Sequence, residues 1–440
     1  MIKFVPFLFF RRPYMNIIAW NRTPTTAEIA DTIKKHSTPL YLVACLNEQQ
    51  IPEFRPSEKA ETLEINLAHT INQKTACLQF SAANVLSDIA PRVHLWLIPP
   101  NCTNRLAEYF SIMPQWQTEP ITQTPLPPLK PWFSSPTHHT IPTRVLIIGA
   151  GIAGAATARE LAERGIPVVI LEAAEPARAA SGNQQGLLYA KISPYHTAQT
   201  ELLLCGYGYS KRIIETLLPK QETWGGRGIL HLNHNETEQQ RNLMLAQQTH
   251  HQHLYHAVNA VEATEIAGIP IFSDGLYWPQ GIWLNPPSVV HALLQHPLIQ
   301  LHTHTPLLSA QFDGQNWQAK TPHQTFTTSH IVYCTGAQTP DLTEPSASAQ
   351  PYKLIRGQTD LADATPVSQK LRCALSGASY ISPAWQEQHC FGATFVHHDT
   401  GCDLRSTDSH TNFSELAKLN TTLATELVDR SWCRSRRARR

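Results

Sequence analysis

The stretch RVLIIGAGIAGAATARELAERGIPVVILEA, residues 144–173, decides the fold class of this 440-residue chain. It reads as a strand, a glycine turn, a helix and a second strand, and both strands are continuous apolar runs of the kind buried in parallel sheets. Gly149 allows a tight turn out of the first strand, Gly151 lets the backbone approach a pyrophosphate, and Gly154 lets the helix lie close on the sheet. This spacing predicts a dinucleotide-binding βαβ unit.

The residues around the three glycines extend the same pattern. Ile152 and Ala153 lie between the last two glycines and belong to the predicted cofactor loop. Glu172 closes the second strand, eighteen residues after Gly154, and Ala173 follows it. A carboxylate at this place can accept hydrogen bonds from ribose hydroxyls, which favours FAD or NAD over NADP. The alternative is a glycine-rich turn that binds no ligand.

A second segment, AASGNQQGLLYAKIS (residues 179–193), begins seven residues after Glu172. A flavin cofactor continues from its pyrophosphate through a ribityl chain to a ring system that has to be held flat, so a second loop of small and polar residues is expected near the first. The segment suits this need and favours FAD, although a surface turn is the alternative. The predicted contacts to the flavin side are Ser181, Gly182, Asn183, Gln184, Gln185 and Gly186.

Composition places the chain among ordinary soluble proteins. The hydrophobic fraction is 42% and the formal net charge is +1, so overall charge indicates no partner. Nine cysteines without a C-x-x-C pair predict reduced thiols in a cytoplasmic protein, with no disulfide framework and no zinc site. The N-terminal MIKFVPFLFFRRPYM is a poor signal peptide and too short for a membrane span. The four histidines of HHQHLYH (residues 250–256) are interpreted as a solvated helix face, and no metal site is predicted.

Several motifs occur in an order that resembles a known family. They are IIGAGIAG, LEA, ASGNQQGLLYAKIS, GLYWPQGIWLNPPSVVHALL, IVYCTGAQT, IRGQTD and FGATFVHHDTGCDLRSTDSHTNFSEL. Together they resemble the FAD-dependent oxidoreductase half of the MnmC family, bifunctional proteins of tRNA wobble-uridine modification. The wider group is the D-amino-acid oxidase and glycine oxidase-like flavoproteins, and the resemblance covers residues 144–430.

The resemblance implies the cofactor FAD, the fold and the reaction. The fold class is α/β with an α+β substrate domain, built on a Rossmann-type FAD-binding domain of the D-amino-acid oxidase-like kind. The reaction oxidatively removes the carboxymethyl group of 5-carboxymethylaminomethyl(-2-thio)uridine in tRNA and leaves the aminomethyl base. The implied partner is tRNA, with no membrane.

Glycine usage divides the chain, since residues 1–148 contain none. Backbone that holds a nucleotide usually needs glycine, so the methyltransferase half of the family is not expected here, and a separate methyltransferase would act on the product. In the first third, PLYLVACL and RVHLWLIPP predict strands, and TTAEIADTIKKH predicts a helix capped by threonine. The predicted parts are a small α/β domain of unknown role (1–117), a Pro/Thr/Ser-rich linker (118–143), an FAD-binding domain (144–222 and 300–345), a substrate domain (223–299 and 346–430) and a basic tail (431–440).

Two cations are candidates for holding the substrate carboxylate, because such a group favours a guanidinium or ammonium partner. They are Arg356 in KLIRGQTD and Lys191 in LLYAKIS, and each could instead be a surface or structural charge. No general base is assigned. Gly336 in YCTGAQT is predicted to approach the adenosine or pyrophosphate, with a plain strand-end turn as the alternative.

Two other functions stay open at this point. One is an amino-acid oxidase similar to glycine or sarcosine oxidase. The other is a truncated, inactive remnant that binds FAD or RNA, because the family ends in a glycine-containing strand and helix, whereas the last glycine here is Gly401. The final seven residues contain five arginines, which either bind RNA phosphates or result from an altered reading frame.

Overall fold

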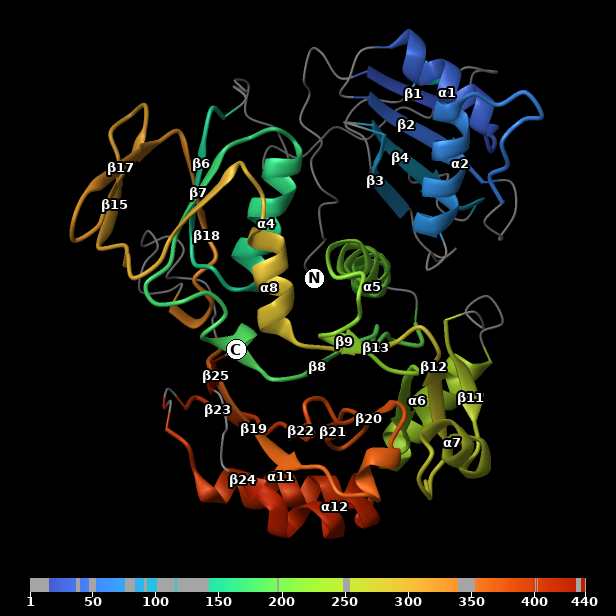
Figure 1. The fold of residues 1–440 in the computed structure, drawn as a ribbon, viewed down its shortest axis with the longest axis vertical. Helices are drawn as coiled ribbons and strands as arrows, with labels where there is room; N and C mark the ends of the chain where they lie inside the picture. The colour runs from blue at the N-terminus through green and yellow to red at the C-terminus, as the bar shows by residue number, and fades with distance from the viewer. Residues whose placement is uncertain are drawn as a thin grey trace. The chain divides into compact units, whose positions relative to one another are not determined.

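The computed structural model of the chain forms two compact units (Figure 1). The first unit comprises residues 1–140, 190–212 and 248–251, and the second comprises residues 141–189, 213–247 and 252–440. The residues that the structure describes are 16–36, 40–46, 53–75, 84–90, 93–100, 115–116, 142–195, 198–247, 254–338, 353–399, 401, 403–432 and 437–439.

The first unit is built on a five-stranded sheet in the order β3-β4-β2-β1-β5, in which only β3 pairs antiparallel. Helix α1 begins with a capping box between Thr25 and Glu28, and Ile29 of this helix packs with Leu42 and Leu95 of the sheet in one core. The predicted threonine-capped helix and the two predicted strands are therefore confirmed. The elements are β1 (Asn16–Trp20), α1 (Thr26–Lys35), β2 (Leu40–Cys45), α2 (Thr62–Thr75), β3 (Asn84–Ala90), β4 (Val93–Ile98) and β5 (Gln115–Trp116); α5 (Ala198–Leu217) begins in this unit.

The second unit contains a parallel sheet in the order β14-β7-β6-β18. All residues of β6 and β7 are buried, because apolar runs such as VLII and VVIL suit strands that are covered on both faces. The antiparallel sheet β15-β16-β17 follows β14 in the chain. The elements are β6 (Val145–Ile148), α4 (Ile152–Glu163), β7 (Val168–Leu171), α8 (Pro286–Leu294), β14 (Ile299–His302), β15 (Ser309–Phe312), β16 (Trp317–Lys320), β17 (Thr325–Thr328) and β18 (His330–Tyr333).

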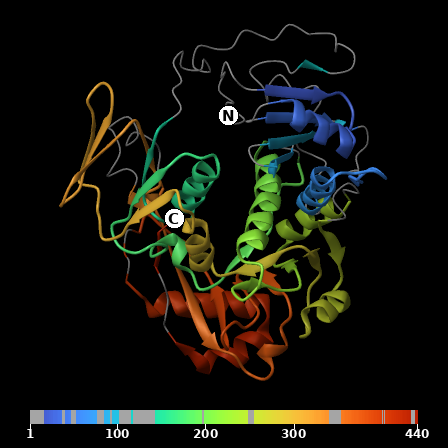
Figure 2. The same ribbon diagram turned by 45° about the horizontal axis from the view of Figure 1, so that its top comes forward.

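A ten-stranded sheet, called here the substrate sheet, forms the other part of the second unit. Its main path is β11-β12-β10-β20-β21-β22-β19-β23, and β24 and β25 also pair with β19. Helices α11 and α12 cover one of its faces, as both ribbon views show (Figures 1 and 2). Leu416 and Leu423 of these helices share a buried core with Leu230 and Phe391 of the sheet.

The bounds of these elements are β10 (Ile229–Leu232), α6 (Glu236–Ala246), β11 (His256–Val258), α7 (Ala260–Ala267), β12 (Gly275–Trp278), β19 (Ile355–Asp363), β20 (Ala374–Ser376), β21 (Tyr380–Ile381), β22 (Gln388–Gly392), β23 (Val396–His397), α11 (Ser406–Leu419), α12 (Thr421–Leu427), β24 (Ser431–Trp432) and β25 (Arg437–Arg439). A small sheet of β8 (Gly186–Leu188), β13 (Ile282–Leu284) and β9 (Trp224–Gly225) completes the unit. Short 3-10 helices are η3 (Ala180–Gly182), η5 (Gly336–Gln338), η6 (Ser368–Lys370) and η7 (Val428–Arg430).

The predicted domain boundaries stay predictions, with one difference to report. The structure groups residues 190–212 with the first unit, whereas the sequence placed them inside the FAD-binding domain. Most of the predicted linker, the N-terminal fifteen residues, three of the four histidines of HHQHLYH and much of the arginine-rich end lie outside the described residues.

The described part of the chain also bears on the thiols, on metals and on membranes. Within it, Cys45, Cys334, Cys373 and Cys390 are free thiols, and no group of three His, Cys, Asp or Glu side chains could hold a metal ion. None of its helices is both long enough and apolar enough to cross a bilayer.

Candidate cofactor site

The glycine turn after β6 is pressed against the end of β18. Gly149 has a φ of +101°, and a Cβ on it would lie 2.5 Å from the carbonyl oxygen of Cys334. Its backbone N–H donates to the Leu171 carbonyl over 2.8 Å. Both the backbone conformation and the close neighbour therefore require glycine here.

Helix α4 begins directly after this turn. A Cβ on Gly154 would lie 1.9 Å from the Gly149 carbonyl oxygen, so the helix approaches the strand more closely than any side chain permits. Gly151 is the N-cap of α4 and supplies no side-chain cap. The helix thus presents backbone N–H groups and the positive end of its dipole at the turn, which is a favourable arrangement for a pyrophosphate.

Glu172 lies at the end of β7 beside the same turn. Its Oε2 accepts from the Ala150 N–H over 2.8 Å, and its Oε1 accepts from the Ala174 N–H over 2.9 Å. The carboxylate is held in place by backbone donors while further lone pairs remain for a ligand. Ala173, the residue after it, is exposed.

The SGNQQG segment (residues 181–186) reaches the glycine turn. The Ser181 Oγ accepts from the Ile152 N–H over 3.0 Å, and it lies where a Cβ on Gly151 would approach it to 3.3 Å. Gly182 is buried, and a Cβ there would meet the Ala177 carbonyl oxygen at 2.7 Å. The structure therefore brings together the turn, Glu172 and the segment, which are separated in the sequence.

The next residues of the segment differ in whether their polar groups have hydrogen-bond partners. The Asn183 Oδ1 is buried and has no hydrogen-bond partner among the described residues. The Gln184 carbonyl accepts from the Asn285 Nδ2 over 2.7 Å, and Gly186 pairs with Leu284 of β13. Gln185 is buried, and its side-chain amide bonds Cys390 of β22 and Pro383 in the loop between β21 and β22.

Gly336 lies just beyond β18, whose neighbour in the sheet is β6. It opens η5 with a φ of +56°, and a Cβ on it would meet no described atom within 4 Å. The Cys334 N–H donates to the Ile148 carbonyl, which holds this strand end next to the glycine turn. The approach of Gly336 to the adenosine or pyrophosphate stays a prediction.

The two candidate cations differ in their surroundings. Arg356 is buried on β19 and forms an ion pair with Asp408 of α11, while its Nη2 donates to the Asp403 carbonyl over 2.6 Å. The pairing of Asp408 with Arg356 could not be predicted from a local pattern, because Asp408 lies 52 residues further along the chain. Lys191 is exposed and belongs to the segment grouped with the first unit. The ion pair favours a structural role for Arg356.

A buried polar cluster on the substrate sheet was also missed by the sequence analysis. The Tyr189 hydroxyl lies 2.9 Å from the Ser376 Oγ and 3.3 Å from the His231 Nδ1. The His231 Nε2 lies 2.7 Å from an oxygen of Glu238, which also pairs with Arg241. Burial raises the pKa of the Tyr189 hydroxyl above its ordinary value. Of its members only Tyr189 lies in one of the motifs quoted above, and Ser376 lies 187 residues further along the chain, so no local spacing indicated the cluster.

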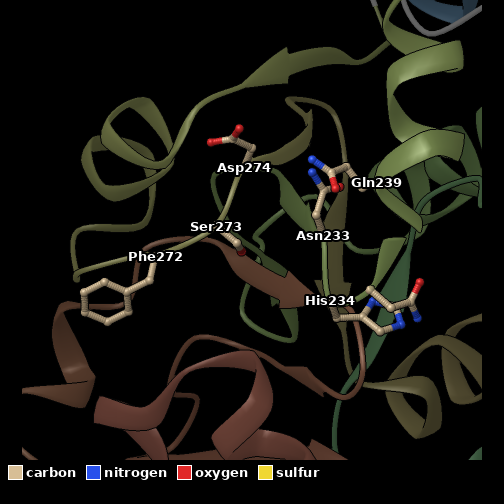
Figure 3. Close-up of a pocket in the computed structure, with 7 residues that line it drawn as sticks. Asn233, His234, Gln239, Phe272, Ser273 and Asp274 are labelled. Carbon is tan, nitrogen blue, oxygen red and sulfur yellow. The ribbon is translucent and has the colours of Figure 1, made fainter. Parts of the chain in front are cut away.

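A separate hollow of about 420 Å³ lies at the N-terminal end of α6 (Figure 3). Its lining contains none of the predicted cofactor residues, and the labelled side chains in Figure 3 do not converge on one point. The lining residues are Asn233, His234, Asn235, Gln239, Phe272, Ser273 and Asp274.

Comparison with known proteins decides the family. The family model described as "FAD dependent oxidoreductase" matches residues 144–439. The chain belongs to this family. Its predicted cofactor, FAD, is thereby confirmed, and so is its character as an oxidoreductase. The match begins one residue before β6 and includes the glycine turn, the SGNQQG segment and the substrate sheet.

Curated relatives narrow the resemblance. The chain is 36% identical over 305 residues to a protein of Pseudomonas putida (strain GB-1) named "tRNA 5-methylaminomethyl-2-thiouridine biosynthesis bifunctional protein MnmC", covering 69% of this chain and 46% of the relative. The protein of the same name from Chromobacterium violaceum is 35% identical over 300 residues, covering 68% of this chain and 45% of the relative. The predicted resemblance to MnmC is confirmed. The chain spans less than half the length of these relatives.

Solved structures support the fold. Glycine oxidase from Geobacillus kaustophilus matches with a TM-score of 0.56 at 20% identity, covering 68% of this chain and 83% of that one. L-proline dehydrogenase from P. horikoshii matches with a TM-score of 0.56 at 14% identity, covering 68% and 81%. The predicted fold class, a Rossmann-type FAD-binding domain with a substrate domain, is confirmed.

The site of this flavoprotein fits the cofactor. Gly151 places the backbone N–H groups of the α4 N-terminus at the turn without a side chain to cover them, and a Cβ on it would meet only the Ser181 Oγ among the described atoms. The buried Asn183 Oδ1, which has no partner among the described residues, could accept from a donor such as a ribityl hydroxyl or a flavin-ring N–H. We therefore propose that Gly149, Gly151, Gly154 and Ser181 hold the pyrophosphate side, Glu172 the ribose, and Gly182, Asn183, Gln184 and Gly186 the flavin side.

Replacing Glu172 by glutamine should weaken FAD binding. Two backbone N–H groups now donate to the two carboxylate oxygens, and the amide would place its NH2 group against one of these donors. The negative charge that strengthens the proposed hydrogen bond from a ribose hydroxyl would also be lost. We expect the dissociation constant for FAD to rise about tenfold or more, since hydrogen bonds to charged groups contribute about 1.5–3 kcal/mol. Fluorescence titration of the apoprotein with FAD measures this, and an unchanged constant would remove Glu172 from the site.

Proposed function

We propose that this chain removes the carboxymethyl group of 5-carboxymethylaminomethyl(-2-thio)uridine at the wobble position of tRNA and leaves the aminomethyl base. The supporting observation is the 36% identity over 305 residues with relatives named for 5-methylaminomethyl-2-thiouridine biosynthesis in tRNA. The glycine oxidase structures are at most 20% identical, so they support the fold and not the substrate.

The reaction consumes one water and passes two electrons to the flavin, so turnover needs an external electron acceptor such as dioxygen to reoxidise it. FAD, when bound, accepts the hydride from the methylene carbon next to the carboxylate. The amine loses a proton and becomes an imine, and water hydrolyses this imine to glyoxylate and the aminomethyl base. The protein has to keep the amine unprotonated, fix the carboxylate and bring the methylene close to the flavin ring.

The carboxylate-binding cation is part of the proposal. Lys191 and Arg356 are the two candidates. Because Asp408 already neutralises Arg356, a substrate carboxylate would have to compete with it. Lys191 is exposed and follows the SGNQQG segment closely in the chain, and an ammonium group is a suitable partner for an anionic substrate.

The partners follow from the same proposal. The substrate is tRNA, the protein works in the cytoplasm, and a separate methyltransferase acts on the aminomethyl product. The absence of glycine from residues 1–148 supports the last point, because a loop that holds S-adenosylmethionine usually needs glycine.

The test is incubation of the FAD-loaded protein with tRNA that carries 5-carboxymethylaminomethyluridine. We expect glyoxylate in equal amount to the aminomethyl nucleoside found by mass spectrometry of the digested tRNA. Parallel reactions contain free glycine or sarcosine. Glyoxylate from these amino acids with an unchanged tRNA nucleoside profile would establish an amino-acid oxidase instead, and failure to take up FAD would establish an inactive remnant.

A further inference from the structure

The stretch from Gln185 to Tyr189, which includes β8, makes buried polar contacts with the substrate sheet. We infer that Gln185 and Tyr189 are positioning residues that fasten the SGNQQG segment to this sheet and thereby fix the flavin relative to the substrate. The inference rests on the proposed placement of the flavin along residues 181–186.

Gln185 provides the first attachment. Its side chain is 1% exposed, its Nε2 donates to the Pro383 carbonyl over 3.0 Å, and its Oε1 accepts from the Cys390 N–H over 3.2 Å. The Tyr380 hydroxyl donates to the backbone carbonyl of Gln185 over 3.3 Å. Because one end of the amide is bonded to β22 and the other to the loop between β21 and β22, the side chain serves this contact and not the cofactor.

Tyr189 provides the second attachment, four residues further along. Its hydroxyl lies 2.9 Å from the Ser376 Oγ and 3.3 Å from the His231 Nδ1. His231 is 2% exposed and is bonded in turn to Glu238 through its Nε2. The Tyr189 hydroxyl therefore contacts a histidine whose other ring nitrogen is bonded to Glu238, which fixes the position of that histidine.

The attached strands are consecutive in the sheet. Cys390 lies on β22, Tyr380 on β21, Ser376 on β20 and His231 on β10, and the sheet order is β10-β20-β21-β22. The stretch from Gln185 to Tyr189 thus contacts residues of four neighbouring strands, and Figure 1 shows β8 beside β20, β21 and β22. Two attachments at opposite ends of β8 fix both its distance from the sheet and its direction.

Loss of the first attachment has a defined consequence. Without the amide of Gln185, the Pro383 carbonyl and the Cys390 N–H lose their partners in a buried place, which favours a shift of the segment away from the sheet. Such a shift would loosen the loop that is proposed to hold the flavin. The effect should therefore be seen in cofactor binding as well as in stability.

Gln185→Met is the test, and Asn420→Leu is its matched control. Asn420 is 2% exposed and bonds in the same manner, with its Nδ2 donating to the Pro270 carbonyl over 2.8 Å and its Oδ1 accepting from the Leu423 N–H over 2.9 Å. Both changes remove one buried amide with two backbone partners from the second unit. The two amides differ in what they join, since Asn420 links the start of α12 to the loop after α7, whereas Gln185 links the SGNQQG segment to residues 383 and 390.

We expect Gln185→Met to raise the dissociation constant for FAD about tenfold, as the loss of roughly one to two net hydrogen bonds implies. Amide hydrogen exchange should become faster in residues 181–189. Asn420→Leu should lower the stability without either effect. Tyr189→Phe, which removes only the hydroxyl, should move both quantities in the same direction as Gln185→Met and serves if that variant does not fold.

Equal FAD affinity and unchanged exchange in Gln185→Met or Tyr189→Phe would overturn the inference, and so would equal changes in Asn420→Leu. The dissociation constant and the hydrogen exchange are both measured with FAD alone, without tRNA. A failure of the protein to act on tRNA would therefore contradict the proposed function, and this test would still give its result.

Discussion

Gly154→Ala should yield a protein that no longer retains FAD. A methyl group on this residue would lie 1.9 Å from the Gly149 carbonyl oxygen and 3.4 Å from the Cβ of Cys334. The first contact is far inside van der Waals distance and involves backbone, so the start of α4 has to move away from the sheet. This movement would displace the N–H groups that face the proposed pyrophosphate.

The expected loss of stability for Gly154→Ala is about 1–3 kcal/mol or more, in the range of overpacked cores. Alanine otherwise favours helix over glycine by about 1 kcal/mol, so a loss shows that the contact dominates. The visible absorption of the purified protein measures bound flavin, and urea unfolding measures stability.

Gly206→Ala is the matched control. Gly206 also lies inside a helix, α5, but a Cβ there would meet no described atom within 4 Å. This variant should keep its flavin and be as stable as the wild type or slightly more stable. Retention of FAD by Gly154→Ala at the wild-type level would show that close packing of α4 on the sheet is not needed for the cofactor.

Removing either partner of the ion pair between Arg356 and Asp408 should destabilise the substrate sheet strongly. Their side chains are 4% and 10% exposed, so Arg356→Met and Asp408→Asn each leave a buried charge without its counterion. Such changes cost about 3–5 kcal/mol. Arg405→Met is a control, since Arg405 is 37% exposed in its pairs with Asp399 and Asp403, and exposed pairs contribute at most about 1 kcal/mol.

The same variants separate a structural role of Arg356 from a role in binding substrate. In a structural role, the double variant Arg356→Met with Asp408→Leu recovers part of the lost stability, because no charge remains unpaired. In a substrate role, Asp408→Asn would leave KM unchanged or lower it, while Arg356→Lys would raise KM with little loss of stability. We expect chemical denaturation to show the recovered stability of the double variant. The changes in KM described for the substrate role would instead assign Arg356 to substrate binding.

The βαβ unit could be predicted from sequence because its strand, glycine turn, helix and second strand lie within thirty residues. The close contact of Gly154 with the Gly149 carbonyl lies inside this unit, whereas the Cys334 carbonyl that faces Gly149 belongs to a strand end far along the chain. The contact of Ser181 with Ile152 was also within reach, because a flavin needs a second loop near the first.

The substrate side of the site was less predictable. Gln185 was interpreted as a flavin contact, but its amide bonds residues about two hundred positions away in the chain. Tyr189 joins Ser376 across 187 positions in the same way. Such pairs depend on the order of strands in the substrate sheet, which no local pattern in a single sequence specifies.

The central claim is that this flavoprotein oxidises the carboxymethylamino group of a tRNA wobble uridine. The most direct measurement is the visible flavin absorption of the FAD-loaded protein, mixed without oxygen with tRNA that carries this group. We expect rapid bleaching of the flavin band, and no bleaching with the same tRNA lacking the group. A band that stays unchanged with the modified tRNA, but bleaches with free glycine or sarcosine, would contradict it.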